Sequence, residues 1–145
     1  ILCPGFEPYV FKNFTNCYGA LNDFIADAGV ITSGTPRWTY IQTAKIKKPS
    51  SFFILGDTVT SYNTGGVWTQ YGSLYIKSWN WAIHARHSGR ANLAYVDGHV
   101  GSVDSGQIIE NIKDMHKDGI GTGSSPDYLI LSNENLTKTA KKIIY

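Results

Sequence analysis

The sequence predicts an α+β domain, built on an antiparallel sheet with a hairpin at residues 91–103 and one or two short helices. Three observations carry this prediction. The apolar and β-branched runs are short, Asp97-Gly98 separates two of them, and one later stretch repeats its apolar residues at helical spacing. The chain has 145 residues, enough for a single domain, 1–145, with its own core.

The hairpin is the most specific local feature. Residues 91–96 and 99–103 are strand-like runs joined by Asp97-Gly98. A two-residue Asp-Gly link favours a type I′ turn, in which both central residues adopt positive φ. We therefore expect positive φ at Asp97 and at Gly98.

Two helices are predicted from apolar spacing. The first covers residues 20–28, ahead of Gly29. The second begins at a cap, Asp104 or Ser105, and ends at Gly119. Its apolar face is Ile108, Ile109, Ile112 and Met115. Further strands are predicted at residues 38–43, 51–55 and 128–131.

The charge pattern argues against a nucleic-acid partner. The net charge is +2 and the basic residues are scattered, with the densest run at Lys45, Lys47 and Lys48.

No signal peptide or transmembrane run is visible, and the chain begins with Ile1. We expect a fragment or a processed product.

Two cysteines, Cys3 and Cys17, lie close together in a short segment. A disulfide between them would suit an exported protein. Two buried free thiols are the alternative.

The region from His87 to Gly98 resembles the signature of prepilin-type proteins with the H-X9-DG motif. Nine residues separate His87 from Asp97-Gly98. Shorter similarities precede it in the family's order: Cys3-Pro4, Tyr18-Gly19, and a segment from Pro49-Ser50 through an apolar run to Asp57. The resemblance covers residues 3–103.

The resemblance implies the head domain of a type IV pilin-like or type II secretion pseudopilin-like structural protein. Members carry an N-terminal leader that is cleaved off, after which the new first residue is methylated. They also carry an apolar helix that anchors the subunit in the inner membrane and packs in a filament. That helix is missing from this sequence. The implied partners are like or related pilin subunits, in the bacterial cell envelope or at the cell surface. We expect the fragment alone to be monomeric.

Strand geometry argues against a catalytic pair of His87 and Asp97. An extended strand between them spans about 20 Å, beyond hydrogen-bond reach. We expect Asp97 and Gly98 to form the turn, and His87 to be a structural anchor near the start of the helix at Asp104.

No cofactor is predicted. Related pseudopilins often hold calcium, and Asp114, Asp118 and Asp127 bracket a glycine-rich loop, but the ligand spacing of an EF-hand is absent. Zinc at His84, His87 and His99 is disfavoured, because His84 and His87 would face opposite sides of a strand.

An alternative function is a surface glycan-binding module. Its aromatic candidates are Trp38, Tyr40, Trp68, Tyr71, Tyr75, Trp79 and Trp81. The competing interpretation is that these rings fill the core. An enzyme is not expected, because no hydrolase, metalloprotease or nucleotide-binding motif occurs.

Overall fold

The computed structural model describes residues 18–21, 31–33, 39–60, 69–74, 81–118, 127–131 and 140–144. Side chains are described within 18–21, 41–60, 69–74 and 82–118. Cys3 and Cys17 lie outside the described residues, so the choice between a disulfide and free thiols stays a prediction.

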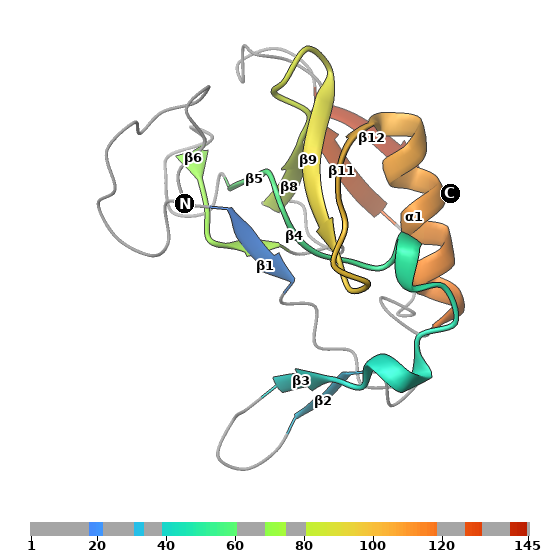
Figure 1. Ribbon diagram of the computed structural model, residues 1–145. Helices are drawn as coiled ribbons and strands as arrows, with labels where there is room; N and C mark the ends of the chain where they lie inside the picture. The colour runs from blue at the N-terminus through green and yellow to red at the C-terminus, as the bar shows by residue number, and fades with distance from the viewer. Residues whose placement is uncertain are drawn as a thin grey trace.

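The described part of the chain is a mixed α+β fold with one α-helix and two five-stranded sheets (Figure 1). The first sheet has the order β10-β9-β4-β1-β7 and the second β12-β11-β8-β5-β6, while β2 and β3 form a separate pair. Most pairs are antiparallel, and β1 with β7 and β8 with β11 are parallel. This agrees with the predicted class in its coarse form.

The elements have the following bounds. The strands are β1 Gly19–Leu21, β2 Ile31–Ser33, β3 Thr39–Ile41, β4 Phe53–Gly56, β5 Thr58–Thr60, β6 Thr69–Gln70, β7 Ser73–Leu74, β8 Trp81–His84, β9 Arg90–Tyr95, β10 Val100–Asp104, β11 Asp127–Leu131 and β12 Ala140–Ile144. The helices are the 3₁₀ turns η2 Thr43–Lys45 and η3 Pro49–Ser51 and the α-helix α1 Ser105–Lys117.

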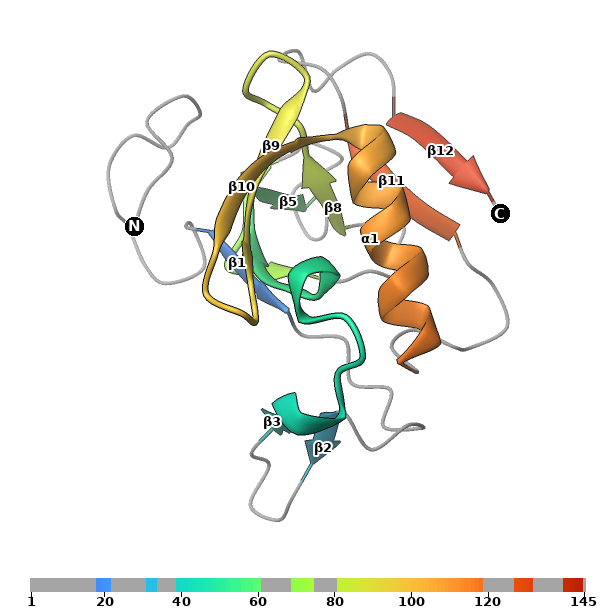
Figure 2. The same cartoon turned by 45° about the vertical axis from the view of Figure 1, so that its right-hand side comes forward.

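The core lies between the first sheet and α1. Ile108, Ile112 and Met115 of the helix are buried with Phe53 and Leu93, which come from β4 and β9. Figure 2 shows α1 on one side of β9 and β10, with β11 and β12 on that same side. The predicted apolar helix face is therefore the one that packs on the sheet.

Asp104 is the N-terminal cap of α1, so of the two predicted caps, Asp104 and Ser105, it is the first that is observed. Its Oδ1 accepts the N–H of Gln107 at 2.9 Å, which satisfies one of the open donors of the first turn. The helix ends at Lys117, before Gly119, and Asp118 is its C-terminal cap.

The hairpin is present, but the predicted turn type is wrong. Asp97 does not adopt positive φ, whereas Gly98 does, at 92°. Tyr95 donates its N–H to His99 O, and Tyr95 O accepts the N–H of Gly98. The loop therefore has three residues, a type I turn followed by a left-handed glycine, and Gly98 alone needs the unusual conformation.

The helix predicted over residues 20–28 is wrong at its start. Ala20 and Leu21 belong to β1, which pairs with β4 on one side and β7 on the other. Long-range pairing overrides the helical spacing there, and residues 22–30 lie outside the described part. The predicted strand 38–43 is shorter than expected, because Thr43 begins η2.

Gly19 allows β1 to lie unusually close to its neighbours. A Cβ at this position would collide with the Thr58 side chain and lie 2.9 Å from the carbonyl carbon of Ser73. The clash with backbone cannot be relieved by a rotamer change. A glycine is therefore required where the first sheet meets the start of β5.

We predict that Tyr95→Phe destabilises the domain by about 1–2 kcal/mol. Tyr95 Oη accepts a 2.7 Å hydrogen bond from Nδ2 of buried Asn111, and this donor would lose that acceptor. Urea unfolding of parent and variant measures the loss. In Tyr95→Phe/Asn111→Leu both polar partners are gone, so this double variant should recover part of it; an equal or larger loss would contradict the explanation.

Candidate functional site: a buried Asp-Arg-His cluster at the sheet crossovers

The described chain passes between the two sheets several times, and two of these passages meet. Asp57 links β4 of the first sheet to β5 of the second. Residues 85–89 lead back from β8 of the second sheet to β9 of the first. At this corner Asp57 contacts both Arg86 and His87.

Asp57 is fully buried and extends the hydrogen bonding of the first sheet. Its Oδ2 accepts the N–H of Asn92 at 2.7 Å, and its own N–H bonds to Asn92 O at 3.1 Å. Its carbonyl accepts the N–H of His84, at 2.9 Å, from the second sheet. One residue thus bonds to a strand of each sheet.

Arg86 supplies the buried positive charge. Its side chain is 2% exposed, and Nε lies 3.6 Å from Asp57 Oδ1. Nη2 donates to the carbonyl of Thr58 at 2.9 Å. A buried carboxylate is costly unless it is paired and hydrogen-bonded. Arg86 and the Asn92 N–H provide that compensation.

His87 is the partly exposed member of the cluster. Its Nε2 lies 3.2 Å from Asp57 Oδ2, and its side chain is 30% exposed. A tight turn holds it there, with Ser88 at φ 53° and Gly89 at φ 79°, and reciprocal backbone bonds join His87 to Arg90. Two successive positive φ values mark a type I′ turn.

His87 is predicted to be a structural anchor near the start of the helix at Asp104, but the residue that its side chain contacts is a different one. The ring contacts the crossover residue Asp57. The contact to Asp104, at the start of α1, is made instead by Arg90, whose Nη1 lies 3.9 Å from Asp104 Oδ2. Sequence reasoning placed His87 near the helix because the hairpin returns there, and gave Asp57 no role.

Asp97 lies at the other end of β9 and has its own partner. Its Oδ1 lies 2.6 Å from His99 Nδ1 and accepts the His99 N–H at 3.2 Å. The hydrogen bond from His99 lowers the pKa of the Asp97 carboxyl. The His99 ring stacks on Tyr95, with centroids 4.1 Å apart. His87 and Asp97 thus act at opposite ends of one strand, and each has a partner of its own.

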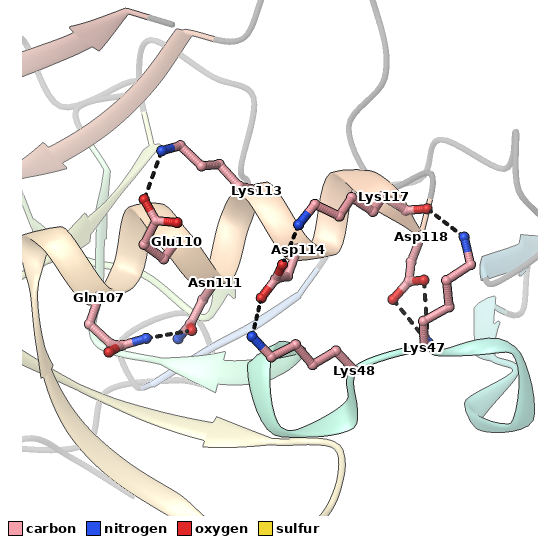
Figure 3. Close-up of polar contacts among 9 residues, drawn as sticks. All are labelled: Lys47, Lys48, Gln107, Glu110, Asn111, Lys113, Asp114, Lys117 and Asp118. Atoms are coloured by element: carbon pink, nitrogen blue, oxygen red, sulfur yellow. Dashed lines mark hydrogen bonds and ion pairs between the residues drawn. The ribbon is translucent and has the colours of Figure 1, made fainter.

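Two of the calcium candidates are engaged by lysines (Figure 3). Asp114 pairs with Lys48 at 2.6 Å and Lys117 at 2.8 Å. Asp118 accepts the backbone N–H of Lys47 at 3.2 Å from Oδ2. The Lys48 and Lys47 contacts fasten α1 to the segment before η3. At Asp114, the ammonium groups of Lys48 and Lys117 lie where a metal cation would compete.

The side chain of Asp127, in β11, is outside the described set. Among the residues that the structure describes, no three His, Cys, Asp or Glu side chains are grouped to hold a metal ion. Neither is any described helix long and apolar enough to cross a membrane.

A groove of about 570 Å³ lies on the first sheet, on the face away from α1. Its lining is mainly apolar: Tyr18, Leu55, Gly56, Asn92, Leu93, Ala94 and Val100. Of the aromatic candidates for glycan binding, Tyr71 is half-buried. The side chains of the others lie outside the described set, so that alternative stays a prediction.

Comparison with known proteins gives no relative. No family model matches the chain, and no curated protein or solved structure matches it.

We predict that Asp57→Asn destabilises the domain by about 3 kcal/mol, because Arg86 would remain buried without its counter-charge. The free energy of unfolding in urea measures this. Asp97→Asn is the matched control, since it removes a carboxylate from the exposed hairpin tip, and it should have a much smaller effect. Equal losses in the two variants would contradict a special role for Asp57.

We also predict that Asp114 makes the free energy of unfolding depend on pH in the acid range. Hydrogen bonds from Lys117 and Lys48 hold the pKa of Asp114 well below its usual 3.8. A lowered folded pKa stabilises the fold above about pH 4, and this stabilisation is lost as pH falls further. Asp114→Asn should therefore lose less stability than the parent between pH 7 and pH 3.

Urea unfolding at the two pH values tests the Asp114 prediction. Glu110→Gln removes a carboxylate from an exposed pair on the same helix, with Lys113, and is the control. If Asp114→Asn and the parent lose the same stability on acidification, Asp114 is not the responsible group.

Proposed function

We propose that this domain is the head of a type IV pilin-like or pseudopilin-like structural subunit. One observation carries the proposal. Asp57 is the last residue of one segment of the resemblance, and His87 is the first residue of another. Their side chains contact each other at 3.2 Å, at the corner between the sheets.

The other residues of the resemblance also have structural roles. Gly19 permits the close approach of β1 to Thr58, and Gly98 provides the left-handed turn of the hairpin. If the match in spacing were due to chance, there would be no reason for these residues, far apart in the sequence, all to have structural roles in one fold. Their joint placement supports a family-specific architecture.

The proposed role is structural and not catalytic. The Asp57 carboxylate is fully buried, and the groups around it compensate its charge. We propose that the domain works through its surfaces, contacting like or related subunits in a filament of the bacterial cell envelope. Inner-membrane attachment would come from the N-terminal helix that the resemblance implies.

The test is the maturation of the protein in its own bacterium. We predict that mass spectrometry of the purified native protein finds a methylated first residue, followed by an apolar segment with Glu at position five and then by this domain. The residue preceding the cleavage site should be glycine, and replacing it should leave the precursor uncleaved.

A matched strain without prepilin peptidase serves as the control, and it should accumulate the same precursor. A native protein whose domain follows directly after an ordinary secretory signal would overturn the proposal. Cleavage that persists without the peptidase would overturn it as well.

A further inference from the structure

One row of side chains runs across four neighbouring strands of the first sheet. The register pairs Val100 with Ala94, Ala94 with Leu55, and Leu55 with Ala20. Paired residues project from the same face of a sheet. Because the alternate residues Leu93 and Tyr95 pack with α1, this row lies on the opposite face.

The row is apolar and accessible. Val100 is 73% exposed and Leu55 41% exposed, and these are the exposed large hydrophobic residues of the described part. Ala20 is exposed and Ala94 is half-buried. The row borders the groove of about 570 Å³, to which Val100, Ala94 and Leu55 contribute. Accessible apolar patches of this kind mark contact surfaces.

Large and small side chains alternate along the row in the order Val100, Ala94, Leu55, Ala20. A twofold axis parallel to the strands would bring a second copy face to face and reverse that order. Val100 then lies opposite Ala20 of the second copy, and Leu55 lies opposite Ala94. Every large side chain meets a small one, as interdigitated sheet packing requires.

We propose that this row is a self-complementary contact surface whose partner is a second copy of the same chain. The contact is isologous, so it closes at two copies and does not propagate a filament. It therefore goes beyond the proposed function and does not rest on it. Four side chains per copy bury less than a stable dimer needs, so the pairing is weak, with Kd of about 1 mM.

NMR dilution of the folded domain tests this surface. Between about 0.05 and 2 mM, the range around the expected Kd, concentration-dependent amide shifts should gather at Ala20, Leu55, Ala94 and Val100. Leu55→Lys should abolish them, because it places two charges in the contact. Ser50→Lys adds the same charge at an exposed site on η3 and should leave them unchanged.

A side-chain swap separates this packing from general stickiness. Val100→Ala leaves a gap opposite Ala20, and Ala20→Val sets two valines against each other, so each should weaken pairing about tenfold. The double variant exchanges large and small across the axis and should restore it. Circular dichroism checks that each variant is folded.

Three outcomes would overturn the proposal. The shifts could lie elsewhere on the surface, the chain could stay monomeric throughout the concentration range, or the double variant could pair no better than the single ones. In each case the row is not a contact surface for a second copy. None of them bears on the maturation of the N-terminus.

Discussion

The described fold depends on how the chain moves between two sheets while the buried charge of Asp57 at the corner keeps a counter-charge. At one corner the chain passes from the first sheet to the second at Asp57, and later, after β8, from the second sheet to the first through Arg86 and His87. Each passage interrupts a ladder of backbone hydrogen bonds, and buried backbone groups must find partners. The Asp57 carboxylate takes the Asn92 N–H, and Arg86 takes the Thr58 carbonyl. The corner is thus closed by side chains where backbone pairing stops.

This buried cluster acts differently from the apolar core. Burial of Phe53, Leu93 and Ile112 is favourable in many arrangements, because the hydrophobic effect has no direction. A buried carboxylate is tolerated only in an arrangement that places hydrogen-bond donors and a counter-charge close to it. We infer that Asp57 contributes less to net stability than to selecting one crossing of the sheets. The lysine contacts of Asp114 and Asp118 then hold α1 against the segment before η3.

The elements that sequence predicted well are those specified by neighbouring residues. The hairpin follows from a turn between two apolar runs, and α1 follows from its cap and its apolar face. Two of the wrong or missing predictions have long-range causes. Ala20 is in a strand because β4 and β7 pair with it, and Asp57 bonds to Asn92, 35 positions along the chain. Local periodicity carries no information about such partners.

The nine-residue spacing in the motif has a physical reason. His87 must reach Asp57 at one end of β9, and Gly98 must turn the chain at the other. The six residues of β9 span about 20 Å between these points. Adding one residue would exchange the two faces of the strand and move Leu93 and Tyr95 away from α1. The length of β9 and the packing of its core face therefore require nine residues between His87 and the Asp97-Gly98 pair. No chemical step involving both His87 and Asp97 is needed to explain the spacing.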